Sequence, residues 1–257
     1  MFQTISNFMR VRDIRNKIIF TLLMLIVFRI GTFIPVPNVD ANVLKAVNEF
    51  NIVGFLNTFG GGALANFSIF AMGIMPYITA SIIVQLLQMD VVPKFAEWSK
   101  QGEVGRRKLA QFTRYFTIVL GFIQSFAMSY GFNAMYGGTL IKDTSIGSYL
   151  TIAIVLTAGT AFLLWLAEQI TAYGVGNGIS IIIFAGIVAA MPNAVNQLYA
   201  QKIEGAGDQL FLNIVILLLL LLIILAIVVG VIYVQQALRK IPIQYAKRVA
   251  GRGQATV

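Results

Sequence analysis

The chain has 257 residues, of which 58% are hydrophobic and 11% are charged, a balance typical of membrane proteins and unlike that of soluble globular domains. It contains no histidine and no cysteine, which excludes thiol chemistry, disulfide bonds and metal sites built on histidine. Its net charge of +9 requires no nucleic-acid partner, because the membrane topology accounts for it. The composition therefore predicts an all-α polytopic membrane protein.

Apolar runs long enough to cross the hydrocarbon core predict α-helical spans along the whole chain. The predicted spans cover 18–36, 73–90, 112–133, 148–170, 178–192 and 210–236. Prolines and glycines end the first span near residue 36, and the sequence Met191-Pro192-Asn193 ends the fifth. The segments 37–58, 134–147 and 193–209 are predicted to be connecting loops on one side of the membrane.

The charges predict the orientation of these spans. Most lysines and arginines fall on one side, whereas the opposite loops hold only Lys45, Lys142 and Lys202. The basic side is cytoplasmic by the positive-inside rule, and an even number of spans places both ends of the chain there. The basic N-terminus, 1–17, precedes an uncleaved first span and is predicted to be cytoplasmic or interfacial, and 237–257 is predicted to be a cytoplasmic loop.

One apolar segment does not read as a single span. It runs from Gly60 to Gln88, and Gly73 and Pro76 interrupt it. Because proline fits the first turn of a helix better than its interior, we expect a short element at about 60–71 and a true span at about 73–90. Non-helical backbone at membrane depth persists only where protein buries it or where it lines a watery cavity. The break therefore favours a transport path, with a tilted or kinked span as the alternative.

Few charges fall within the predicted spans. Arg29 is the plainly intramembrane one, facing either a water-filled cavity or the interface, and Glu168 lies near a cytoplasmic helix end. An ion-coupled carrier is disfavoured, since it would need acidic residues in the bilayer. The same absence removes most intramembrane hydrolase chemistry, so the prediction is a protein that is not an enzyme and needs no cofactor.

Four longer motifs carry a family likeness. They are "GIMPYITASIIVQLL" (73–87), "GEVGRRKLAQFTRY" (102–115), "EQITAYGVGNGISIIIFAGIV" (168–188) and "IQYAKR" (243–248). Together they resemble the SecY family, the central subunit of the bacterial protein-translocation channel, and the match runs along the whole chain. One departure is Ala172-Tyr173, where relatives often place a charged or polar residue before the glycine.

The resemblance implies a ten-helix channel of two pseudo-symmetric halves with a ring of apolar side chains at its waist. The matching positions for this pore ring are Ile74, Ile78, Ile179 and Ile183. The family's plug corresponds to about 55–70, with Phe59, Gly60, Gly61, Gly62, Ala63 and Leu64 inside it. By spacing alone these isoleucines are lipid-facing or packing residues, and a fixed re-entrant turn is the alternative to a movable plug.

The resemblance also implies a lateral gate and a docking surface for cytoplasmic partners. The gate residues are Met75, Thr79, Ile82 and Gln85, which by chemistry alone also serve as ordinary contacts between helices. The docking residues are Arg106, Arg107, Lys247 and Arg248, although basic cytoplasmic loops occur in any such protein.

The implied function is a passive channel subunit that passes unfolded secretory polypeptides across the plasma membrane and releases hydrophobic segments into its lipid. Implied partners are SecE, SecG, the SecA motor, the ribosome and the C-terminal half of SecY. The expected organisation is a five-helix half at 18–192, an external loop and sixth helix at 193–236, and a truncated loop at 237–257, as in a fragment of a longer or split SecY. The alternatives are a non-pore scaffold or insertase-like component and, less favoured, a small-solute carrier.

Overall fold

The computed structural model describes residues 11–40, 43, 57, 60–89, 91–204 and 209–237. The predicted site residues Phe59, Lys247 and Arg248 lie outside these ranges. The described residues form α-helices and turns with two isolated β-bridges, which confirms the all-α prediction. The chain divides into two compact units, Met1–Ala194 and Val195–Val257.

The first described helix, α2, spans Arg12–Gly31. It begins before the predicted residue 18, because the helical backbone continues into the polar residues that precede the apolar run. It ends before the predicted residue 36, at the glycine rather than at Pro35. A Cβ at Gly31 would lie 1.9 Å from the ring of Phe70, so glycine is required where this helix packs against Phe70.

The predicted break lies where expected. Residues 60–74, here called the turn segment, form successive turns and no regular helix. Gly73 has a φ of +55°, which favours glycine, and α5 then begins at Met75 with Pro76 in its first turn. Backbone hydrogen bonds join the turn segment to the chain after α2, from Val36 N–H to Phe67 O at 3.0 Å and from Ile69 N–H to Ile34 O at 3.0 Å.

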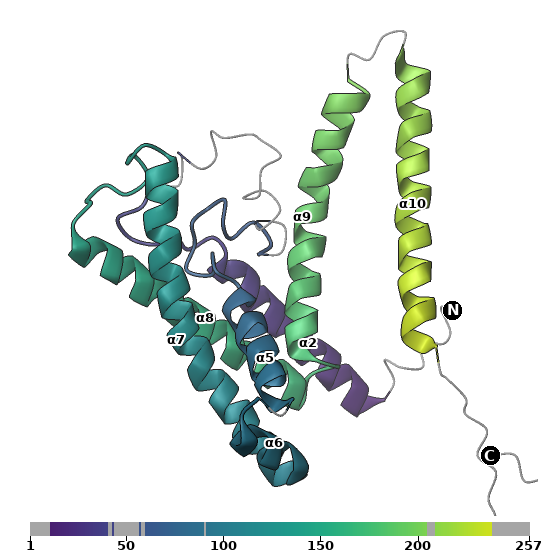
Figure 1. The fold of residues 1–257 in the computed structure, drawn as a ribbon. Helices are drawn as coiled ribbons and strands as arrows, with labels where there is room; N and C mark the ends of the chain where they lie inside the picture. Colours follow the sequence, from purple (N-terminus) through teal and green to yellow (C-terminus); the bar gives the residue numbers. More distant parts are fainter. Residues whose placement is uncertain are drawn as a thin grey trace, which may run out of the picture. The chain divides into compact units, whose positions relative to one another are not determined.

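Four further described helices follow this segment along the chain before α9. The helix α5 spans Met75–Gln88, and α6, Pro93–Lys100, follows it at an angle of 92°. The long helix α7 spans Glu103–Met135 and packs against α5, α6 and α8, which spans Ile146–Tyr173 (Figure 1). The helix α7 therefore begins well before the predicted residue 112. The helical backbone continues into the polar residues that precede the apolar run.

The face that α7 presents to its neighbours consists mostly of small residues. Its buried positions recur every fourth residue and are Gly105, Leu109, Thr113, Thr117, Gly121, Ser125, Ser129 and Asn133. At Gly121 the nearest atoms belong to Pro76 of α5 and Thr157 of α8. Small residues allow helix backbones to approach closely, which is how membrane helices pack where lipid is as apolar as the side chains.

The fifth predicted span is wrong at its C-terminal end. The helix α9 spans Gly178–Lys202 and contains Pro192, which was predicted to end it. A proline removes one backbone hydrogen bond but does not prevent the helix from resuming, and the residues that follow continue it. In the second unit, α10 spans Leu210–Gln236, as predicted, and buries none of its residues within the described chain.

Two hydrophobic clusters form the core, and the turn segment contributes to both. The first contains Val36, Leu64, Phe67, Ala71, Leu140, Ile141, Tyr149, Ile152 and Leu156. The second, here called the isoleucine cluster, contains Phe28, Ala63, Phe70, Ile74, Leu163, Leu166, Ala167, Ile170 and Ile182. The turn segment is thus part of the core and not a surface loop.

Four helices in the described part of the chain are long and apolar enough to cross a membrane. They are α7, α8, the Gly178–Ala200 part of α9, and α10, with a fifth span if α5 and α6 form one bent pair. The helix α5 has 14 residues, which rise only about 21 Å at 1.5 Å per residue, less than the roughly 30 Å of a hydrocarbon core. Spans at α2 and α5 remain predictions, whereas a multi-pass membrane protein is established.

Candidate functional site

The four predicted ring isoleucines come together in one hydrophobic cluster. Ile74, which precedes α5, is 6% exposed and is a member of the isoleucine cluster. Ile78 in α5, and Ile179 and Ile183 near the start of α9, are partly buried and pack against it. Residues separated by about a hundred positions in sequence therefore share one apolar neighbourhood.

The turn segment places the predicted plug residues between α2 and α9. Ala63 and Leu64 are 0% and 1% exposed, and each belongs to a different cluster. Gly61 has a φ of +63°, and a Cβ on it would lie 3.0 Å from the Cα of Gly186 in α9. Glycine is needed at this position for both the backbone conformation and the close approach.

Arg29 provides the charged contact to this segment, which sequence reasoning did not find. Its Nη1 donates a hydrogen bond of 2.5 Å to the carbonyl oxygen of Gly61, and its guanidinium lies 4.8 Å from the ring centroid of Phe33. The sequence singled out Arg29 as an intramembrane charge, and that signal was the available one. Its partner could not be predicted, because backbone carbonyls carry no mark in a sequence.

The predicted gate residues occupy the side of α5 that faces away from the rest of the described chain. The buried residues of α5 are Pro76, Ala80 and Val84, whereas Met75 and Ile82 are 42% and 52% exposed. The hydroxyl of Thr79 donates to the carbonyl of Met75, and the amide of Gln85 donates to Ser81 on the same helix. This stripe, Met75, Thr79 and Ile82, is apolar for most of its length, with Thr79 half-buried between two exposed residues.

Two of the four predicted docking residues are described by the structure, and they lie near the start of α7 and not in a loop. Arg106 and Arg107 are both exposed. Arg107 pairs with Glu103 one turn earlier at 2.6 Å, with both side chains 79% exposed. An exposed pair of this kind is worth about 0.3–0.5 kcal/mol, so it leaves the arginine available to an acidic partner.

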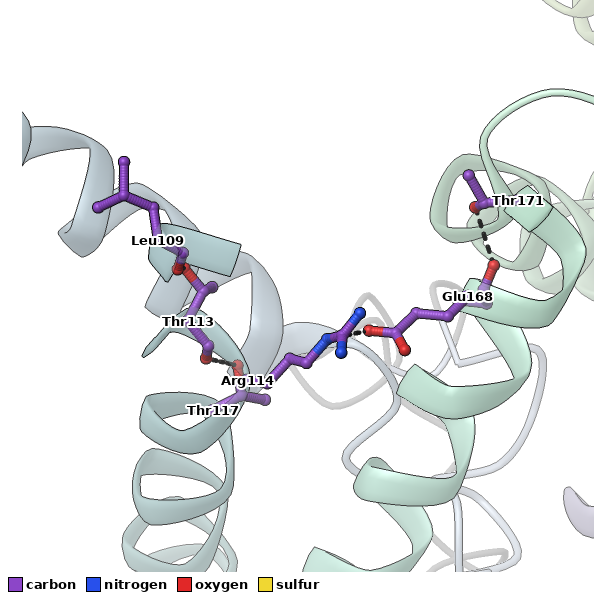
Figure 2. Close-up of polar contacts among 7 residues, drawn as sticks. Leu109, Thr113, Arg114, Thr117, Glu168 and Thr171 are labelled. Carbon is purple, nitrogen blue, oxygen red and sulfur yellow. Dashed lines mark hydrogen bonds and ion pairs between the residues drawn. The ribbon is translucent and has the colours of Figure 1, made fainter. Parts of the chain in front are cut away.

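A second ion pair joins α7 to α8 (Figure 2). Nε of Arg114 contacts a carboxylate oxygen of Glu168, with side chains 48% and 33% exposed. Around the pair, threonine hydroxyls bond to the carbonyl four residues earlier, from Thr113 to Leu109 and from Thr117 to Thr113 (Figure 2). The sequence analysis placed Glu168 near a cytoplasmic helix end, and Arg114 lies in the basic motif 102–115 near the start of another span, a signal that could have predicted their pairing.

The described residues contain no group of three acidic, cysteine or histidine side chains that could hold a metal ion. The chemistry that this arrangement supports is steric and electrostatic. It consists of an apolar cluster, a glycine-rich segment seated against it, and one cation bonded to that segment.

Comparison with known proteins identifies the family. The SecY family model matches residues 68–257. A relative in Bacillus licheniformis named "Protein translocase subunit SecY" is 74% identical over 257 residues, which cover 100% of this chain and 59% of the relative. The relative of the same name in Bacillus subtilis is 69% identical over 260 residues and is covered to 60%.

A solved structure described as "The structure of a protein conducting channel" matches 75% of this chain and 39% of that one, at 20% identity and a TM-score of 0.47. Among the curated relatives, the chain spans about 59% of the length of the one in Bacillus licheniformis. The family model covers well over half of the chain, and the relatives match it from end to end. The chain belongs to the SecY family.

Proposed function

We propose that this chain is part of a protein-conducting channel that passes unfolded secretory polypeptides across the bacterial plasma membrane and releases hydrophobic segments into its lipid. The proposal rests on membership of the SecY family, whose close relatives are named as translocase subunits. The single observation that carries it is the turn segment, a non-helical stretch buried against the isoleucine cluster at the break of a membrane segment. This break favours a channel over a non-pore scaffold, since a scaffold does not require non-helical backbone at membrane depth.

In this function Ile74, Ile78, Ile179 and Ile183 form one side of an apolar constriction. Branched apolar side chains exclude water from a narrow opening and thereby block ions. They also offer a passing polypeptide no hydrogen bonds that would hold it. The turn segment is the plug, and its burial between two clusters corresponds to the closed state.

The exposed stripe of α5, Met75, Thr79 and Ile82, forms one side of the lateral gate. A largely apolar stripe that is partly exposed suits either lipid or a partner helix that separates when a hydrophobic segment leaves. Gln85 belongs to the same side of the gate, and its amide donates a hydrogen bond to Ser81 on α5.

The remaining assignments concern orientation and partners. The basic segments lie in the cytoplasm and both ends of this chain face it, following the positive-inside rule. Arg106, Arg107, Lys247 and Arg248 dock carboxylates or phosphates of the SecA motor or the ribosome, which supply the driving energy. SecE, SecG and the C-terminal half of SecY complete the channel wall in the membrane. The subunit itself is a conduit and catalyses no reaction.

The test uses the absence of cysteine from the chain. A single cysteine replaces Ile183 in the assembled complex, and a stalled secretory polypeptide carries one cysteine of its own. We expect a disulfide between the two whose yield depends on the stall position. The matched control is Phe184→Cys, the next residue of α9, which is 66% exposed. Crosslinking at 184 with none at 183 would show that the isoleucines are packing residues and would reject the channel.

A further inference from the structure

Arg29 is a charged residue at a position where removing its side chain from water costs free energy. It lies in the last turn of α2, and its neighbours on the helix are apolar. A charged side chain in an apolar environment is retained when something compensates it, such as a backbone carbonyl, an aromatic face or a helix C-terminus. Arg29 has all three, in Gly61 O, the ring of Phe33 and the end of its own helix.

Gly61 also lies close to the backbone of α9. The backbone of Gly61 approaches the Cα of Gly186 in α9 so closely that an added Cβ would lie 3.0 Å from it. Its left-handed conformation, with a φ of +63°, is one that other residues adopt with strain. The start of the turn segment is thus seated between the arginine of α2 and the glycine of α9.

The other hydrogen bonds between the turn segment and the α2 end are neutral and lie farther along the chain. Asn66 Nδ2 donates to Thr32 O at 3.4 Å, and backbone bonds join residues 67 and 69 to residues 36 and 34. Hydrogen bonds with an ionised donor are roughly twice as strong as neutral ones. Arg29 therefore supplies the charged hydrogen bond to residues 60–64, in addition to the apolar burial of Ala63 and Leu64, whereas residues 66–69 are attached by neutral bonds.

We propose that Arg29 is the positioning residue that holds residues 60–64 in the closed position, through its hydrogen bond to the carbonyl of Gly61. The inference rests on the proposed function, because it takes this segment to be the plug. When the bond breaks, the segment leaves α9 and turns about the attachment at residues 66–69. The positive-φ glycines Gly62 and Gly73 on either side of that attachment supply the hinge.

The experiment measures exposure of the segment directly. The reporter is Ala63→Cys, at a position that is 0% exposed and in a chain with no other cysteine. The full protein in its membrane assembly is treated with a membrane-impermeant maleimide, and the rate of modification is followed. The variants are Arg29→Gln, which removes the charge, and Arg29→Lys, which keeps it. Arg15→Gln, an exposed arginine of the same helix, is the matched control.

We expect Arg29→Gln to raise the modification rate by roughly ten- to a hundredfold, the factor that corresponds to losing a charged hydrogen bond. Arg29→Lys should give a smaller rise, because a lysine ammonium restores the donor without the planar geometry. Arg15→Gln should leave the rate unchanged. The ion conductance of the resting channel should rise in the same order as the modification rate.

A second reporter, Ala153→Cys in α8, is also 0% exposed and lies outside the segment. It should stay protected in every background. Unchanged protection of residue 63 in Arg29→Gln would overturn the proposal, and so would a parallel rise at residues 63 and 153, since Arg29 would then support the whole fold. Failure of the proposed function is a separate result, seen as no crosslink to a stalled polypeptide at Ile183 whatever the modification rates.

Discussion

At the scale of single residues, glycine decides how closely the elements of this protein approach one another. At Gly159 in α8, an added Cβ would lie 1.9 Å from the carbonyl oxygen of Ile69 in the turn segment. The neighbouring atom belongs to the backbone and cannot rotate away. Gly131 in α7 is a helical glycine with no atom within 4 Å of its added Cβ. A substitution at Gly159 therefore tests close packing, and the same substitution at Gly131 tests helix propensity alone.

We expect Gly159→Ala to destabilise the protein by about 1–3 kcal/mol, because the methyl group forces α8 and the turn segment apart. Gly131→Ala should be neutral or stabilising by up to about 1 kcal/mol, because alanine favours the helix. Thermal unfolding of both variants in detergent measures the difference. Equal melting temperatures for the two variants would show that the approach at Gly159 is looser than described.

The carboxylate of Asp143 organises the loop before α8 by accepting hydrogen bonds from it. Its carboxylate accepts hydrogen bonds from the hydroxyl and the backbone N–H of Ser145, at 2.9 and 3.1 Å, and from the hydroxyl of Ser148 at 3.0 Å. These bonds, of which the Ser145 hydroxyl contributes most, lower the pKa of Asp143 below its ordinary value. Ser145 in turn caps the helix by accepting from the N–H of Ser148.

A lowered pKa in the folded state means that ionised Asp143 adds stability above its unfolded pKa of about 3.9. That contribution is lost as the pH falls through the lower, folded-state pKa. We therefore expect Asp143→Asn to melt below the parent at neutral pH and to approach it in acid. Melting temperatures of the two proteins across the acid range provide the check, and a constant difference would contradict the assignment.

At the scale of elements, the pairing of α7 with α8 combines a small-residue face with one ion pair. The glycines, serines and threonines of α7 allow close contact along its length. Arg114 and Glu168 then join the two helices at one end (Figure 2). Since both side chains are partly exposed, solvent screens the attraction, and the pair fixes which ends meet more than it stabilises the fold.

A double-mutant cycle tests this pair with Arg114→Gln, Glu168→Gln and the double variant. We expect a coupling free energy of about 1 kcal/mol or less, so that the double variant is less destabilised than the sum of the two single ones. The coupling should weaken as salt is added. Melting temperatures in detergent are measured for the parent, the two single variants and the double variant. If the two single effects on stability add up to that of the double variant, the contact contributes nothing.

Pro192 shows the limit of local rules at the element scale. A proline with neighbouring asparagine predicts the end of a helix, yet α9 continues to Lys202. The lost hydrogen bond costs roughly 3 kcal/mol in water, but the residues on both sides still favour helix over an unpaired backbone in a membrane. The same reasoning succeeded at Pro76, because that proline lies in the first turn of α5, where its missing N–H breaks no helical hydrogen bond.

At the scale of the whole molecule, the proposed channel depends on elements that are far apart in the chain. The isoleucine cluster draws on α2, the turn segment, α8 and the start of α9. The proposed plug is part of the same core, so opening it exposes apolar surface as well as breaking hydrogen bonds. That cost favours a closed resting state, and a passing polypeptide must replace the buried contacts that the segment gives up.

The sequence by itself determined the class, most of the helices, the break before α5 and the family. These follow from apolar run length, from the backbone limits of glycine and proline, and from long motifs in the right order. It also identified the four isoleucines, although their role came from the resemblance and not from their spacing.

Only the tertiary structure decided which groups meet. It paired Arg29 with the carbonyl of Gly61, Arg114 with Glu168, and Gly61 with Gly186. The physical reason is that periodicity reports which face of one helix is apolar, and it carries no information about the element that covers that face. A backbone carbonyl is moreover present at every residue, so its selection as a partner depends on the fold alone.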